Sequence, residues 1–321
     1  MSLNLRDYFR NAVENNLTIQ KALSPLAGSR CLITGANGII GYALSRLIDA
    51  HASADLFLAS RRFQYVGQEM LSEKVKHVDY SLLQGERFDY IFHCATYSQP
   101  SKFLSDWDPT IRLSTVTLLD LLASTDVRLI FASSTEVYSG LSNVSTETEN
   151  GTTTPQHPRG VYIESKRVAE AACARSAIAS ASRIAPTAGP YAGKDDTRVI
   201  FELIRRGRAN RSVTLYGGHK NVRQYQYTGS CALRMIVSGI LGKESVYNNA
   251  GPYVNTLENF AKAIADKLQV PYQATGDSSL VSGAADSVRV SMDRFHTEFP
   301  EMKDIDPSLD NFICWLVEDY A

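Results

Sequence analysis

A tyrosine and a lysine at helical spacing are the residues of this chain that most directly suggest chemistry. Tyr162 and Lys166 stand four residues apart in the segment YIESK, so on a helix their side chains share one face. A tyrosine with its ordinary pKa of about 10 is a poor base at neutral pH, but a neighbouring ammonium group stabilises its phenolate. The pair therefore predicts an acid/base that moves a proton to or from a substrate hydroxyl group.

A hydroxyl-rich segment precedes this pair and reads as the end of a strand. Residues 131–138 have the sequence FASSTEVY. Ser134 could hydrogen-bond the substrate oxygen while Tyr162 moves its proton and a hydride passes to a nicotinamide. Thr135 and Glu136 follow directly. Glu136 could act as a base or position a substrate carboxyl group, and it could equally be a surface carboxylate or a helix cap.

A glycine turn predicts the site for that nicotinamide cofactor. Residues 34–41 read TGANGIIG and lie between the apolar run 30–34 and an amphipathic helical pattern. Glycines at these spacings permit a tight turn, close approach of a pyrophosphate and close packing of helix on strand. No Lys-Ser or Lys-Thr follows, which disfavours a triphosphatase loop. The cofactor-binding residues predicted from this turn are Gly35, Asn37, Gly38, Ile39 and Ile40.

The end of the second predicted strand bears on the choice of cofactor. It carries Ser60, Arg61 and Arg62 and no acidic residue. An acid there would bind the ribose 2′-hydroxyl of NAD, whereas an arginine accommodates the 2′-phosphate of NADP. The prediction is therefore NAD(P) with a slight preference for NADP, although both arginines could simply be solvated. Asp79, after the third predicted strand, could contact the adenine or serve as a turn residue.

The elements that must position these residues alternate between strand and helix. Strands are predicted near 30–34, 56–59, 75–78, 89–94, 128–132 and 182–185, and helices near 110–123 and 162–180. Such alternation is typical of βαβ units, so the fold class is α/β with a doubly wound, mostly parallel sheet of the Rossmann type. A short amphipathic helix is predicted within residues 3–20.

The regular alternation weakens after residue 186. Helical stretches are predicted near 196–208, 229–241 and 256–268, separated by turns. This pattern predicts a smaller mixed lobe that binds the substrate. The predicted domains are an N-terminal helical extension (1–28), a dinucleotide-binding domain (29–186) and a substrate lobe (187–321), with segments that could interleave.

The composition narrows the class of protein and its partners. The 321 residues are 44% hydrophobic and 21% charged, with a formal net charge of −1, which predicts a folded chain without affinity for nucleic acid or anionic membranes. No run approaches the roughly 20 apolar residues of a membrane span. The five cysteines lack paired spacing, and neither they nor the histidines suggest a metal site. We therefore expect reduced thiols and a cytoplasmic location.

Taken together, these motifs resemble the extended short-chain dehydrogenase/reductase family, and in particular its nucleotide-sugar epimerases, dehydratases and decarboxylases. The resemblance covers residues 29–318 and rests on TGANGIIG, FDYIFHCAT, SSTEVY, YIESK, RIAPTAGPY and VTLYGGHKNVRQYQYTG. It implies that Ser134 binds the substrate, that Tyr162 is the acid/base, and that Lys166 is its partner. It also places His93 and Ala95 beside the cofactor and Gln99 and Arg223 at the substrate. It further implies a homodimer joined through a four-helix bundle, here the helices near 110–123 and 162–180.

The same resemblance frames the expected reaction on a nucleotide sugar. Bound NAD(P) would oxidise C4 transiently, and elimination, decarboxylation or epimerisation would follow. The carboxylate of Glu136 favours a dehydratase or decarboxylase. The alternatives are a 4-epimerase, an NADPH-dependent reductase, or a non-catalytic dinucleotide-binding sensor or scaffold. The chain has Arg223-Gln224-Tyr225 where the family often has Arg-Asp-Phe, so the identity of the sugar stays open.

Overall fold

A seven-stranded parallel sheet forms the centre of the molecule. The computed structural model describes residues 5–60, 71–83, 86–124, 127–190, 192, 196–276 and 287–319. The strand order in this part of the chain is β11-β7-β5-β4-β1-β2-β3, and every neighbouring pair is parallel. The strands are β1 (Arg30–Thr34), β2 (Asp55–Ala59), β3 (Lys76–Val78), β4 (Tyr90–His93), β5 (Arg128–Ser134), β7 (Ala179–Ile184) and β11 (Val246–Asn249).

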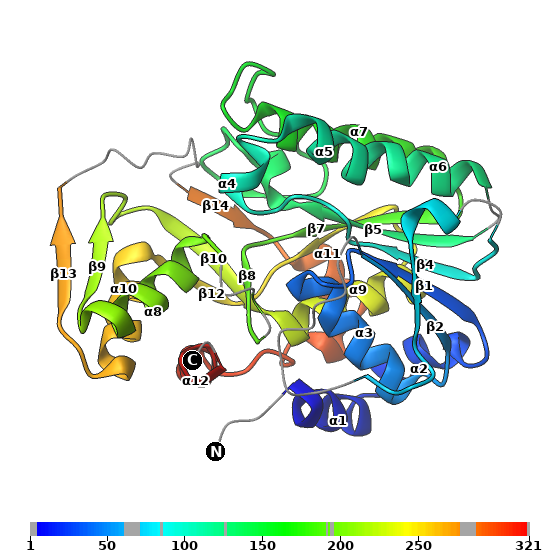
Figure 1. Cartoon of the computed structure of the whole chain (residues 1–321), viewed down its shortest axis with the longest axis horizontal. Coiled ribbons are helices and arrows are strands. Elements are labelled where there is room, and N and C mark those ends of the chain that lie inside the picture. The colour runs from blue at the N-terminus through cyan, green and yellow to red at the C-terminus, as the bar shows by residue number, and fades with distance from the viewer. Residues whose placement is uncertain are drawn as a thin grey trace.

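Helices cover both faces of this sheet, which is why its central strands are almost continuously buried. One layer holds α3 (Ile39–His51) and α9 (Thr228–Leu241), with α1 (Leu5–Asn15) and α2 (Leu17–Leu23) packed outside them (Figure 1). The other layer holds α5 (Trp107–Ile111), the π-helical turn η3 (Arg112–Val116), α6 (Thr117–Ser124) and α7 (Gly160–Arg175). The predicted doubly wound α/β fold is confirmed.

The short helix predicted within residues 3–20 is α1, and a second helix follows it. The Asn16 side chain separates the two, because it accepts hydrogen bonds from the backbone N–H groups of Thr18 and Ile19 and so caps α2. A later helix prediction was wrong in its end. The helix predicted over 162–180 ends at Arg175. Its last predicted residues instead enter β7, where buried alanine and serine side chains fit between β5 and β11. Tertiary pairing overrides the helix propensity of alanine there.

A smaller lobe follows the large sheet and lies to the left in Figure 1. Its main sheet has the order β12-β10-β14-β6, with β8 beside β10, and a two-stranded sheet joins β13 to β9. The strands are β6 (Val144–Ser145), β8 (Thr187–Ala188), β9 (Val213–Tyr216), β10 (Val222–Tyr227), β12 (Tyr253–Thr256), β13 (Tyr272–Thr275) and β14 (Ser287–Val290). Its helices are α8 (Val199–Asn210), α10 (Leu257–Leu268) and α12 (Leu309–Asp319), whereas α11 (Asp293–Glu298) packs against β11 of the large sheet.

The chain crosses between the two parts more than once. Strand β11 and helix α9 come after residue 186 but belong to the large sheet and its helical layer, whereas β6 comes earlier and pairs with β14. The division into domains at 28/29 and 186/187 stays a prediction.

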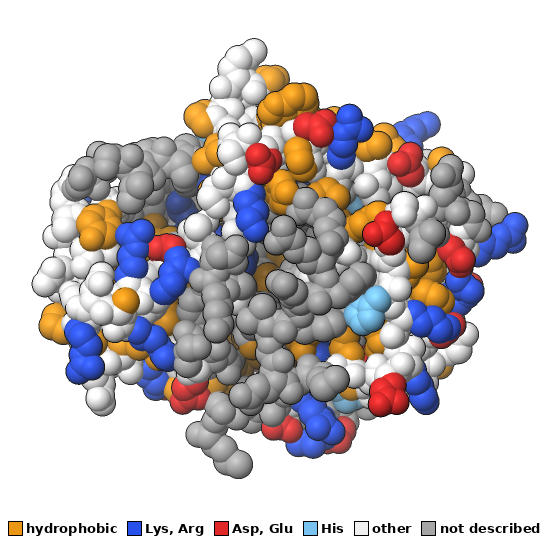
Figure 2. Space-filling model, in the orientation of Figure 1, with side chains coloured by type: hydrophobic (Ala, Val, Ile, Leu, Met, Phe, Trp, Pro, Cys, Tyr) orange, Lys and Arg blue, Asp and Glu red, His pale blue; other side chains and the backbone are white. Residues whose placement is uncertain are grey.

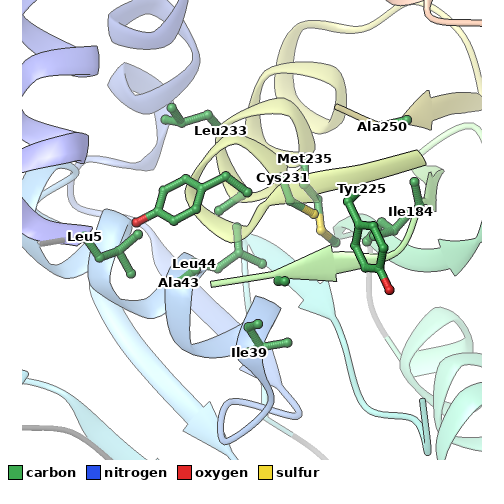
Figure 3. Packing of buried hydrophobic residues seen from close by; sticks show 14 of the residues in the cluster. Leu5, Ile39, Ala43, Leu44, Ile184, Tyr225, Cys231, Leu233, Met235 and Ala250 are labelled. Carbon is green, nitrogen blue, oxygen red and sulfur yellow. The ribbon is translucent and has the colours of Figure 1, made fainter. Parts of the chain in front are cut away.

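A continuous apolar core joins both parts. Side chains from α1, α3, α9 and β10 meet in it, including those of Leu5, Leu44, Leu233 and Tyr225 (Figure 3). This packing fixes the first turn of α3, which follows the glycine turn, against the rest of the fold. Among the described residues, no helix is long and apolar enough to cross a membrane, and no group of acidic, histidine and cysteine side chains could hold a metal ion.

Candidate functional site

The glycine turn lies between the carboxyl ends of three neighbouring strands. Gly35 has a φ of +67°, and a Cβ atom on it would lie 2.7 Å from the backbone N of Ala95. Its N–H donates to the carbonyl oxygen of Ala59 at 2.9 Å, and Gly38 then caps α3 from the N-terminal side. Only glycine fits this close approach of backbones. The turn thus leads directly into a helix N-terminus, which is the arrangement that binds a pyrophosphate.

Buried polar atoms around the turn support a fit to a dinucleotide. Asn37 Oδ1 follows β1, whereas Thr96 Oγ1 and Gln99 Oε1 follow β4, and all three lack a hydrogen-bond partner within the described part of the chain. A buried polar atom without a partner carries a desolvation cost that a bound polar ligand can remove. These atoms lie on loops at the carboxyl edge of the sheet, where ligands of doubly wound folds bind.

The remaining residues predicted to bind the cofactor are distributed as follows. His93 is fully buried at the end of β4, and its Nδ1 is 2.7 Å from Thr34 Oγ1. Ser60 directly follows β2, Ala95 follows β4 by two residues, and both are buried. Ile39 and Ile40 begin α3, where Ile39 is buried and Ile40 is half-buried. Asp79 is exposed and caps the short helix η2 (Tyr80–Leu82), as a turn residue does. Arg61 and Arg62 lie outside the described residues.

One residue that supports the turn, Tyr80, was not predicted. The hydroxyl oxygen of Tyr80 accepts a hydrogen bond from Gly35 N–H at 3.0 Å. Tyr80 comes directly after Asp79, and only the pairing of β3 beside β2 brings it to the glycine turn.

The predicted acid/base group assembles where β5 meets α7. Ser134 ends β5 and caps the short helix η4 (Thr135–Tyr138). Tyr162 and Lys166 lie on α7, which packs on β5, and both are buried. Lys166 Nζ donates to the carbonyl oxygen of Ala132 at 2.7 Å, and the Ser134 hydroxyl is near enough to Tyr162 to lower the pKa of its phenol. The structure therefore brings the three predicted side chains together.

Burial controls the protonation of this group. It lowers the pKa of Lys166 to about 7, which nearby negative charge partly opposes. Burial also raises the pKa of Tyr162 to about 12, although the Ser134 hydroxyl and the positive charges of Arg159 and Arg198 work in the opposite direction. The phenol is thus protonated at neutral pH, and it depends on these cations to act as a base.

Glu136 is held by an arginine that the sequence analysis missed. The Arg159 guanidinium forms an ion pair with the Glu136 carboxylate and is almost fully buried. The Phe103 ring stacks on Tyr162 with 4.6 Å between centroids, and the Arg159 guanidinium carbon lies 5.3 Å from the same Phe103 ring. Glu136, Arg159 and Tyr162 therefore share one corner of the site. Thr135 is buried in the same turn.

Two further arginines come from the segments after β7, and the charge of one of them, Arg198, acts on Tyr162. Arg223 lies on β10, and its charge acts on the buried Tyr225. Arg198 donates to Asp196 at 2.6 Å and to the carbonyl oxygen of Thr187 at 3.2 Å, and its charge reaches both Tyr225 and Tyr162. Arg198 was not predicted, because only the tertiary fold brings it near Tyr162, which lies 36 residues earlier in the chain. Gln99, predicted at the substrate, directly precedes α4 (Pro100–Phe103), the helix that carries Phe103.

A family comparison matches most of the chain. The sequence model described as the NAD dependent epimerase/dehydratase family matches residues 31–237. This range contains the glycine turn, the Ser134 strand end and helix α7.

Individual relatives share less than a third of their residues with this chain. The chain is 28% identical over 283 residues to UDP-glucuronic acid decarboxylase 1 of Xenopus tropicalis, which covers 83% of this chain and 66% of that protein. It spans about two thirds or less of the length of the curated relatives it matches.

Solved structures share the fold at lower sequence identity. An epimerase from Methanothermobacter thermautotrophicus has a TM-score of 0.80 at 16% identity, with 95% of both chains covered. The UDP-glucuronic acid 4-epimerase from Bacillus cereus, in complex with UDP-glucuronic acid and NAD, has a TM-score of 0.71 at 18% identity, with 90% of this chain and 98% of that chain covered.

Proposed function

We propose a reaction for this chain, which belongs to the NAD dependent epimerase/dehydratase family. It is an enzyme that oxidises C4 of a nucleotide-linked uronic acid. It then releases the C5 carboxylate of that sugar as carbon dioxide. The observation that carries this proposal is the joint placement of Ser134, Tyr162 and the Glu136–Arg159 ion pair in one corner of the site. The likeness to UDP-glucuronic acid decarboxylases supports the same substrate class.

The glycine turn and the residues after β4 would hold the cofactor. A bound nicotinamide cofactor supplies a reversible two-electron oxidation of the C4 carbinol. Gly35 and Gly38 would leave room for the pyrophosphate, and Asn37, Thr96 and Gln99 offer the polar atoms that lack partners. Arg61 and Arg62 favour NADP over NAD, and titration of the purified protein with each cofactor tests that preference.

Tyr162 would accept the proton of the sugar's C4 hydroxyl group. Its phenolate takes the proton of the C4 hydroxyl, while Ser134 holds the same oxygen by a hydrogen bond and Lys166 stabilises the phenolate. The C4 ketone makes the C5 carboxylate a β-keto acid. The C5–C6 bond then breaks, its electron pair moves toward the C4 oxygen, and carbon dioxide leaves. Tyr162 and Ser134 stabilise the enolate oxygen that results. Protonation at C5 and return of the ketone to an alcohol leave no net redox change.

The ion pair of Glu136 favours loss of carbon dioxide over the outcomes that need a base at C5. Epimerisation at C5 and 4,6-elimination both need a base that removes the C5 proton, whereas decarboxylation needs none. The Glu136 carboxylate is engaged in an ion pair with the buried Arg159 guanidinium, and taking a proton from C5 would neutralise Glu136 and leave that guanidinium unpaired. Arg159 can instead share its charge with the substrate carboxylate and orient it. Because Glu136 retains part of that charge, Arg159 would orient the substrate carboxylate without holding it so tightly that the loss of carbon dioxide is opposed.

A 4,6-dehydratase is the second candidate. The Glu136 side chain keeps 24% of its surface exposed, so it stays within reach of a bound ligand. If a neutral sugar leaves Arg159 in place, Glu136 would have to act as the C5 base from within the ion pair.

The test is conversion of defined substrates by the purified protein. With NAD or NADP added, UDP-glucuronate labelled with ¹³C at C6 should release labelled carbon dioxide, followed by NMR. UDP-glucose and dTDP-glucose serve as dehydratase and epimerase substrates. Tyr162→Phe should lower kcat by about 10³-fold. Conversion of the neutral sugars alone would favour the second candidate, and full activity of Tyr162→Phe would contradict the assigned acid/base.

We also propose a homodimer and a cytoplasmic location. Exposed hydrophobic side chains gather along the upper edge in Figure 2, where α5, η3, α6 and α7 lie. They are Trp107, Val116, Leu119 and Val168. Burying such a patch against its own copy would form a four-helix interface, and sedimentation as a monomer would contradict it. All five cysteines are free thiols, which supports a reducing compartment, and cell fractionation tests that location.

A further inference from the structure

Helix α7 carries a third polar side chain on the face that holds Tyr162 and Lys166. Glu170 follows Lys166 by one further helical step of four residues, and only 10% of its side chain is exposed. Burying a carboxylate is costly unless it is paired and hydrogen-bonded. Glu170 is both, because Ser133 Oγ donates to it and Arg183 Nη2 donates to its Oε2 at 2.8 Å.

The partners of Glu170 tie together the segments that bear the catalytic groups. Ser133 immediately precedes Ser134 at the end of β5. Arg183, on β7, also donates to the Tyr138 hydroxyl at 2.8 Å and to the carbonyl oxygen of Glu149 at 3.1 Å. Tyr138 ends the short helix η4, in which Thr135 and Glu136 lie. A single carboxylate thus fixes the end of β5 directly and the end of η4 through Arg183.

The same carboxylate lies one helical step from Lys166 on α7, and its negative charge acts on the Lys166 amine. The other titratable groups around Lys166 carry no charge at neutral pH: burial lowers the pKa of His93 to about 3 and raises that of the Cys94 thiol to about 12. Tyr162, one turn earlier on α7, is a neutral phenol for the same reason. Arg183 carries a positive charge, but its guanidinium is turned toward Glu170, Tyr138 and backbone carbonyls. Among the described residues whose charge acts on Lys166, Glu170 is the carboxylate that favours its protonated form.

We propose that Glu170 is a positioning residue of this site, which holds the Ser134 strand end through its hydrogen bond with Ser133 and places its negative charge one helical step from Lys166. The inference rests on the proposed function, since both effects matter for turnover only if Ser134, Tyr162 and Lys166 act on substrate. The charge effect on Lys166, however, exists in the protein without any ligand.

The experiment separates the charge of Glu170 from its hydrogen bond. Glu170→Gln keeps the shape of the side chain and removes the charge, whereas Ser133→Ala removes one hydrogen bond and keeps the charge. In Glu170→Gln the titration of Lys166, followed by NMR of ¹³C-labelled lysine in the ligand-free protein, should move to lower pH by about one unit. The alkaline limb of the kcat profile should move in the same direction, and kcat at pH 7 should fall about five-fold, because the protonated fraction of Lys166 falls by that factor. Ser133→Ala should lower kcat without moving either titration.

Glu164→Gln is the matched control. Glu164 lies on the same helix and pairs with Arg167 at 2.8 Å, but its side chain is partly exposed and contacts none of the catalytic groups in the described structure. This variant should leave the Lys166 titration and kcat unchanged. Restoration of the titration by Glu170→Asp would support the role of the charge, and it also serves if Glu170→Gln does not fold.

Two results would overturn the inference. One is an unchanged Lys166 titration in folded Glu170→Gln, and the other is full activity of both Glu170→Gln and Ser133→Ala. Failure of the proposed function looks different: the NMR titration would still move, while the parent protein would convert no nucleotide sugar.

Discussion

The two sides of the candidate site are held in place by different means. On the cofactor side, backbone groups hold the turn in place: Gly35 N–H donates to the carbonyl oxygen of Ala59, and the close approach to Ala95 leaves no room for a side chain. On the acid/base side, buried ion pairs hold the side chains in place, namely Glu136 with Arg159 and Glu170 with Arg183. One side depends on the shape of the chain, and the other depends on charge.

This difference implies different responses to change. A backbone turn tolerates a new side chain only where space exists, and it is indifferent to pH. When one partner of a buried ion pair is neutralised, the shape of the side chains is kept, but the pair no longer stabilises the site, because the other charge is left buried and unpaired. We therefore expect steric substitutions to affect the cofactor side and charge substitutions to affect the acid/base side.

The largest effect is expected for Gly35→Ala. The new Cβ would lie 2.7 Å from the Ala95 backbone N, and the residue would keep a φ of +67°. Separating β1 from β4 and straining the backbone should cost roughly 3 kcal/mol of the free energy of unfolding. Urea unfolding measures that cost, and titration with NAD should show weakened binding in the protein that remains folded.

Gly28→Ala is the control that isolates the effect of space. Gly28 has a similar φ of +72°, but a Cβ atom there would meet nothing within 4 Å. Its cost should be only the left-handed backbone penalty of about 1 kcal/mol. Equal losses in the two variants would show that conformation alone, rather than the packing of the turn, holds the cofactor side.

The same contrast explains what could be predicted from the sequence. The glycine turn, the parallel sheet and the placement of Tyr162 beside Lys166 follow from spacings within short segments, and the structure has all three. Ser134 could be predicted because a strand that ends in hydroxyl residues is itself a local pattern.

The partners of these residues could not be predicted. Arg159 is 23 residues from Glu136, and Arg183 is 13 residues from Glu170. Which arginine pairs with which carboxylate depends on how β5, α7 and β7 pack, and many exposed arginines in the chain offer the same local pattern. Tyr80 was missed for the same reason, since pairing of β3 with β2 brings it to Gly35. The helix ends at Asn16 and Arg175 depend on a side-chain cap and on strand pairing, which periodicity does not report.

A smaller and more selective effect is expected for Arg159→Gln on the acid/base side. If Arg159 orients the substrate carboxylate, its loss removes a charge-assisted hydrogen bond and should weaken binding of UDP-glucuronate about 30-fold. Binding of UDP-glucose, which lacks the carboxylate, should change little. Calorimetric titration of the cofactor-loaded protein with both ligands makes the comparison.

An exposed arginine provides the control for that substitution. Arg10 pairs with Asp7 on the surface of α1, where its side chain is 57% exposed. Arg10→Gln should leave both affinities unchanged, because exposed pairs contribute little. If Arg159→Gln weakens the binding of UDP-glucuronate and of UDP-glucose equally, then Arg159 supports the structure of the site and does not bind the substrate carboxylate.

The smallest effect concerns the pH dependence of stability, and it tests whether charge really governs only one side. Burial lowers the pKa of Lys166 from about 10.5 to about 7. Between these values the unfolded chain holds a proton on Lys166 that the folded chain has released, so the free energy of unfolding rises with pH, by at most about 1.4 kcal/mol per unit from this group. Buried cysteines act in the opposite sense above their ordinary pKa, so the measurement must be a difference.

Urea unfolding of the parent protein and of Lys166→Met at pH 7.5 and 8.5 should show the parent gaining about 1 kcal/mol relative to the variant. Gly35→Ala should keep the parent's slope, since it changes shape and no charge. Parallel curves for the parent and Lys166→Met would mean that folding leaves the proton on Lys166, and the negative charge of Glu170 would then outweigh burial at this site.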